Sequence, residues 1–119
     1  MKKLLSTVVI FLLIVASAFA LSRQEARRIY IGAYNSGYDN YEPYNGYPDT
    51  SMLKILFLRQ IANDPGFKTY SDTDKLAIAN LLAEGYQKGF FDHSRKIRRD
   101  PDAAWDNTRW AIYGGPYGL

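Results

Sequence analysis

The sequence predicts an all-α protein, a single small domain built as a bundle of about four helices with a long tyrosine-rich loop between the first two. Three stretches carry apolar residues at helical spacing, and no stretch shows the strict alternation of a half-buried strand. The 119 residues are 47% hydrophobic and 23% charged and contain no cysteine. This composition excludes collagen-like chains, disulfide scaffolds and highly charged disordered chains.

The N-terminal residues have the pattern of a signal peptide. Two lysines precede an uncharged run over residues 4–20, which closes with the small residues Ala18 and Ala20. A retained membrane anchor is the alternative, but the run is shorter than the ~20 apolar residues that a spanning helix needs. We therefore expect residues 1–20 to be cleaved and the protein to be exported, either periplasmic or secreted, with no integral membrane segment after cleavage.

The charge of the mature chain argues against nucleic acid as a partner. Cleavage would remove Lys2 and Lys3 and leave 13 basic residues against 12 acidic ones in residues 21–119. A nearly neutral domain has no general attraction for a polyanion. Because the chain is free of cysteine, we expect neither a disulfide nor a lipid anchor on the mature N-terminus.

The first two helices are expected over residues 23–36 and 50–63. Ser22 and Glu25 match a capping box, which predicts a helix start at residue 23. The second stretch is apolar on most sides, so we expect it to be the central helix of the bundle. It is stopped by Asp64, Pro65 and a following glycine.

The last two helices are expected over residues 72–89 and 101–113. Ser71 and Asp74 form a second plausible capping box, and Pro101 occupies the first turn, where its missing amide hydrogen costs nothing. The C-terminal helix and tail, residues 101–119, are aromatic. Their tryptophans and tyrosines supply either core or contact area; they are Trp105, Trp110, Tyr113 and Tyr117.

One short pattern occurs twice, at an offset of 52 residues. Each copy has a small residue, a tyrosine, two polar residues, a glycine and an aromatic residue. We interpret both copies as helix-packing or capping residues, because small residues four apart let helix backbones approach closely and glycine is common just after a helix. The alternative is a pair of functional sites. The residues concerned are Ala33, Tyr34 and Gly37, and Gly85, Tyr86 and Gly89.

Tyrosine recurs at every third position of the predicted loop 38–49, at Tyr38, Tyr41, Tyr44 and Tyr47. In a polyproline II conformation these four rings would line one edge at intervals of ~9 Å and form a binding surface. The alternative is a loop folded over the helices with its rings buried as a lid.

A basic run, Arg95, Lys96, Arg98 and Arg99, precedes the last helix. It is either a solvated surface or a contact for an anionic partner such as lipid head groups, a wall polymer or an acidic protein. The single histidine, His93, lacks the further ligands of a zinc site, and no spacing suggests a calcium site or another cofactor.

These features predict a small exported protein that binds a protein partner through the four loop tyrosines and the four basic residues. The segment Gly85-Tyr86-Gln87-Lys88-Gly89 is similar to a G-Y-x-x-G pattern in some small exported helical immunity proteins, which use disulfides that this chain lacks. That resemblance implies inhibition of a toxin as one form of the function.

Two alternatives remain. The first is a cell-wall or glycan-binding protein with tyrosine and tryptophan platforms. The second is a small hydrolase that uses Asp92 and His93, although we lean toward a protein that is not an enzyme because no nucleophile and base are recognisable together.

Overall fold

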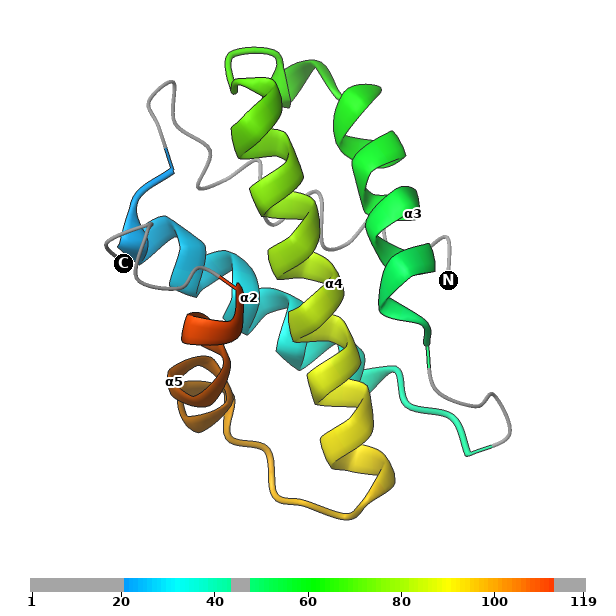
Figure 1. Ribbon diagram of the computed structural model, residues 1–119. Coiled ribbons are helices and arrows are strands. Elements are labelled where there is room, and N and C mark those ends of the chain that lie inside the picture. Colours follow the sequence, from blue (N-terminus) through cyan, green and yellow to red (C-terminus); the bar gives the residue numbers. More distant parts are fainter. Residues whose placement is uncertain (1–20, 44–47, 113–119) are drawn as a thin grey trace.

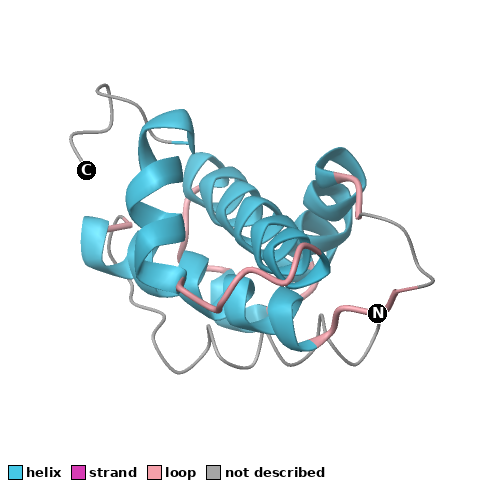
Figure 2. Ribbon diagram, turned by 90° about the horizontal axis from the view of Figure 1, so that it is seen from below, coloured by secondary structure: helices cyan, strands magenta, loops and turns pink. Residues whose placement is uncertain are grey.

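The computed structural model describes residues 21–43 and 48–112, with side chains as far as residue 107. Four α-helices and one 3₁₀ turn make up this part of the chain (Figure 1): α2 over Arg23–Asp39, α3 over Thr50–Ala62, η1 over Pro65–Phe67, α4 over Asp72–Ser94 and α5 over Pro101–Ile112. Within these ranges all regular structure is helical (Figure 2), as the sequence predicts.

Each α-helix begins at a side chain that accepts a hydrogen bond from its first turn. Ser22 accepts from the amide of Glu25 at 3.1 Å, and Glu25 accepts in return from the amide of Ser22, which completes the capping box. Ser71, Asp49 and Asp100 cap the other three helices in the same way. The predicted helix starts at residues 23, 50, 72 and 101 are therefore confirmed.

The ends of two helices differ from the prediction. α2 continues to Asp39 rather than residue 36, and α4 continues to Ser94 rather than residue 89. The glycines Gly37 and Gly89 thus lie inside helices and do not end them. They are used for close contact between the two helices, a role that local sequence cannot distinguish from capping.

Glycines allow α2 and α4 to cross with their backbones in contact. An added Cβ at Gly89 would overlap the Tyr34 carbonyl oxygen, and one at Gly37 would overlap the Tyr86 carbonyl oxygen. At Gly85 an added Cβ would lie 2.6 Å from the Tyr30 carbonyl oxygen. The two backbones therefore touch directly, and no side chain fits between them.

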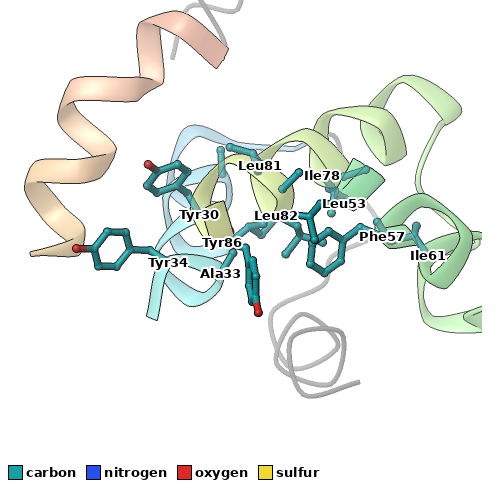
Figure 3. Close-up of a cluster of buried hydrophobic side chains, with 14 of the residues drawn as sticks. Tyr30, Ala33, Tyr34, Leu53, Phe57, Ile61, Ile78, Leu81, Leu82 and Tyr86 are labelled. Atoms are coloured by element: carbon teal, nitrogen blue, oxygen red, sulfur yellow. The ribbon is translucent and has the colours of Figure 1, made fainter. Parts of the chain in front are cut away.

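The core lies on both sides of α4 (Figure 3). From α3, Leu53, Phe57 and Ile61 recur at every fourth position and are fully buried toward α4. On the other side, the ring of Trp105 from α5 lies 5.5 Å from that of Tyr30 in α2. Burial of each such side chain stabilises the fold by roughly 1.5–3 kcal/mol.

The central helix is α4, not α3 as the sequence suggested. α4 packs against α2, α3 and α5 and lies between α3 and α5 (Figure 1). α3 covers one side only and leaves Met52 and Ile55 more than half exposed. The prediction was wrong because α3 has more apolar residues than its single buried face can hold.

We predict that Gly89→Ala destabilises the protein by about 1–3 kcal/mol, because the added methyl group must push α2 and α4 apart. This range is the net change, because the overlap with the Tyr34 backbone costs more than the ~1 kcal/mol that alanine gains over glycine within a helix. Denaturant unfolding measures the change. The matched control is Gly32→Ala, at a half-exposed position of α2, which should be neutral or stabilising; equal stability of the two variants would refute the close crossing.

Candidate functional site

The structure brings together two segments that are far apart in the sequence. The end of α2 and the residues just after it, 38–41, lie against the end of α4 and the connection that follows it. We call residues 95–100 of this connection the basic loop. Of the tyrosines and basic residues that the sequence suggested separately for partner binding, Tyr38 and Arg99 are thus brought into contact.

The start of the basic loop is bonded to the last turn of α4. The amides of residues 95–97 donate to α4 carbonyls at 3.1, 2.9 and 2.8 Å, the pattern of a helix that closes with a left-handed residue. That residue is Lys96, with φ of 59°, the only described residue besides glycines with a positive φ. Glycine is usual at this position because a Cβ makes the left-handed conformation costly.

The rest of the loop is bonded to one face of α2. The Tyr38 hydroxyl donates to the Ile97 carbonyl at 2.7 Å, and the Tyr34 hydroxyl accepts from the Asp100 amide at 3.3 Å. Arg99 forms an ion pair with Asp39 on the same face. Both ends of the loop are therefore fixed by hydrogen bonds.

A buried carboxylate lies beneath the loop. Asp92 is 4% exposed; it accepts a hydrogen bond from the Tyr34 hydroxyl at 2.6 Å, and its other oxygen lies 3.0 Å from the Lys88 ammonium. Burial, together with this hydrogen bond to Asp92, raises the pKa of Tyr34 above its ordinary value, so Tyr34 stays a neutral donor. The network joins α2, α4 and the first residue before α5.

This network was not predicted. Asp92 falls on the same stripe of α4 as Gly85 and Gly89, at spacings of seven and three residues, where an acid is unexpected. An ionisable residue on an apolar stripe is the signal that could have located it.

Tyr38 and Tyr41 both contact α4, and Tyr38 is helical rather than part of an extended segment. Tyr38 belongs to the last turn of α2, so the loop begins at residue 40 and not at residue 38. The Tyr38 ring stacks on His93 at 4.5 Å; the Tyr41 ring lies 4.8 Å from His93 and meets Phe90 edge-on at 5.1 Å. Both rings are half-buried, as a lid would be. Tyr44 and Tyr47 lie outside the described residues.

His93 and Asp92 have different partners. The His93 Nδ1 atom lies 2.5 Å from the Tyr38 carbonyl oxygen, whereas Asp92 is held by Tyr34 and Lys88. A carbonyl only accepts hydrogen bonds, so this contact places the proton on Nδ1. The two side chains do not converge as the acid–base pair of a hydrolase would.

All four basic residues of the loop are exposed; two of them pack on aromatic rings and two do not. Arg95 lies over the Phe91 ring at 4.2 Å and Arg99 over the Tyr38 ring at 4.7 Å. Lys96 and Arg98 are exposed and form no ion pair with any described residue. Between them Ile97 is 43% exposed, which gives the basic loop an apolar tip.

The remaining candidate residues belong to the crossing of α2 and α4 or to the aromatic C-terminal segment. Ala33, Tyr34, Gly37, Gly85, Tyr86 and Gly89 all lie at the crossing of α2 and α4. Trp105 is buried, while the side chain of Trp110 and residues Tyr113 and Tyr117 lie outside what the structure describes.

Two features are absent from the described part of the chain. No helix there has both the length and the apolar character needed to cross a bilayer. Nor do three or more histidine or acidic side chains gather closely enough in those residues to hold a metal ion.

No protein-family model, curated protein or solved structure matches this chain significantly.

We predict that Lys96→Gly stabilises the protein by about 1 kcal/mol, because glycine adopts the left-handed conformation without the steric cost of a Cβ. Denaturant unfolding measures the gain. The control Lys96→Ala removes the same charge but keeps the Cβ, and it should show no gain. Equal stability of the glycine and alanine variants would contradict the strain at this position.

We also predict that Tyr34→Phe lowers the free energy of unfolding by about 1.5–3 kcal/mol, because the hydroxyl is bonded to a buried carboxylate. Hydrogen exchange at the Asp100 amide should accelerate in the same variant. The control Tyr41→Phe removes the hydroxyl of a half-buried residue that does not contact Asp92, and it should change stability by no more than ~0.5 kcal/mol. Equal effects of both variants would rule out a special role of the Tyr34 hydroxyl.

Proposed function

We propose that this protein binds an acidic surface of a protein partner through the basic loop, residues 95–100. The observation that carries the proposal is the combination of a hydrogen-bonded backbone with two exposed cations, Lys96 and Arg98, that form no ion pair with the described residues. Binding sites that are ordered beforehand lose less conformational entropy on association. The bonds from Tyr34 and Tyr38 supply that order before any partner arrives.

The strained residue supports the same proposal. A lysine at a position that favours glycine costs stability, and its side chain projects into solvent without an ion pair among the described residues. Local backbone strain is frequently found at functional sites. Lys96 brings a charge to the surface that glycine could not supply.

The chemistry of the loop suits a protein partner. Arginine is enriched at protein interfaces, and a central apolar contact is a common feature of them. Arg98 and Ile97 are adjacent and exposed. A glycan platform has less support, because the ring of Trp105 is buried and those of Tyr38 and Tyr41 pack against His93.

The location of the partner follows from the N-terminal pattern. We propose that residues 1–20 direct export and that binding takes place in the periplasm or outside the cell. Inhibition of an exported enzyme or toxin is one form that such binding takes.

The proposal predicts that Lys96→Ala/Arg98→Ala weakens partner binding at least tenfold, about 1.4 kcal/mol. The experiment is affinity capture from envelope extract, with the retained protein identified by mass spectrometry and its affinity then measured at two salt concentrations. Binding should weaken as the salt concentration rises, because salt screens the attraction between exposed charges and the Debye length is only ~10 Å at 0.1 M.

The control for this test is Arg59→Ala/Lys68→Ala, which also removes one lysine and one arginine from exposed positions. Arg59 lies in the last turn of α3 and Lys68 directly after η1, in the segment that leads into the start of α4, whereas the basic loop follows the other end of that helix (Figure 1). Equal weakening by both double variants would refute a specific role of the loop. Capture by anionic lipid vesicles without a protein would replace the acidic protein by a membrane surface.

A further inference from the structure

A pocket of about 700 Å³ opens beside the basic loop, between the second half of α4 and the first turns of α5. Its lining includes the loop residues Ile97 and Arg98, Lys88 from α4 and Asn107 from α5. Its volume lies in the range of pockets that bind small molecules. The pocket thus adds a concave site to the exposed surface described above.

Some of the hydrogen-bond donors of the pocket are uncommitted, although Arg99, which also lines it, is bonded to Asn35 and Asp39. The Lys88 ammonium has three hydrogen-bond donors, and its ion pair with Asp92, at 3.0 Å, occupies one of them. The Arg98 guanidinium carries five donors and forms no ion pair with the described residues. Asn107 is exposed on the same wall. Three side chains therefore present donors to one space.

The carboxylates of the pocket, by contrast, have partners within the protein. Asp92 is bonded to Tyr34 and paired with Lys88. Asp100 accepts from the Ala103 amide at the start of α5. The lining carries three cations, Lys88, Arg98 and Arg99, against the two carboxylates Asp92 and Asp100, so an entering ligand meets a net positive charge next to the apolar surface of Ile97 and Ala103.

We infer that this pocket receives a carboxylate side chain of the partner, a glutamate or an aspartate, between Lys88 and Arg98. The acid oxygens would accept from the ammonium and the guanidinium, and the methylene groups of the side chain would lie against Ile97. Arginine suits this role because its planar donors match the two oxygens of a carboxylate. This inference rests on the proposed function and names the chemistry by which the basic loop selects its partner.

The test compares Arg98→Gln with Arg95→Gln. Both remove one positive charge from an exposed position of the same loop, but only Arg98 lines the pocket, whereas Arg95 lies over Phe91. The probe is a hexaglutamate peptide with blocked termini, titrated into the protein at low salt and followed by NMR. We expect shifts of the Asn107 side-chain amide and at least a tenfold weaker affinity for Arg98→Gln, against no more than a threefold change for Arg95→Gln.

Other outcomes overturn the inference in distinguishable ways. Equal weakening by both variants, with captured partner still bound by the wild type, would show a diffuse charge effect; the pocket would fail and the proposed function would stand. No binding of peptide, together with partner capture that is indifferent to both variants, would remove both. Tighter binding of free succinate than of the peptide would make the ligand a small organic acid.

Discussion

The direct contact of α2 and α4 backbones at their crossing is the constraint on which the rest of the structure depends. Only glycine leaves room there, since a Cβ at Gly37 or Gly89 would overlap a carbonyl oxygen of the other helix. This proximity brings the last two turns of α2 against the end of α4. The hydroxyls of Tyr34 and Tyr38 can then reach Asp92 and the basic loop. A wider crossing would leave a buried carboxylate without its donor and the loop without its support.

The contacts that stabilise the fold and those that support the proposed binding surface therefore involve the same residues. Asp92 is tolerated in the interior because Tyr34 donates to it and Lys88 offsets its charge. The same Tyr34 hydroxyl accepts from the amide of Asp100, and the same lysine lines the pocket. The strained Lys96 sits on this rigid base. Its cost is small against the contacts that hold the loop, so a charged residue can be kept where glycine would be more stable.

Some features of the fold could be predicted from local sequence, and others could not. Ser22, Asp49, Ser71 and Asp100 identify the helix starts because capping involves residues at most three positions apart. The helix ends were harder to predict from the sequence, because a glycine can either end a helix or let two helices touch. The central position of α4 was also missed. The apolar residues of α3 suggested burial on most sides, but Met52 and Ile55 are exposed.

The sequence by itself determined a helical protein with four helix starts, a basic run after the third helix and small residues at spacings that permit close packing. Only the tertiary structure decided that the tyrosines at the end of α2 support that basic run, that Asp92 is buried beneath it, and that a pocket opens at its side. The physical reason is the separation of the partners along the chain. Tyr34 lies 58 residues from Asp92 and 66 from Asp100. Contacts of that range depend on how the helices cross, and no local pattern encodes the crossing uniquely.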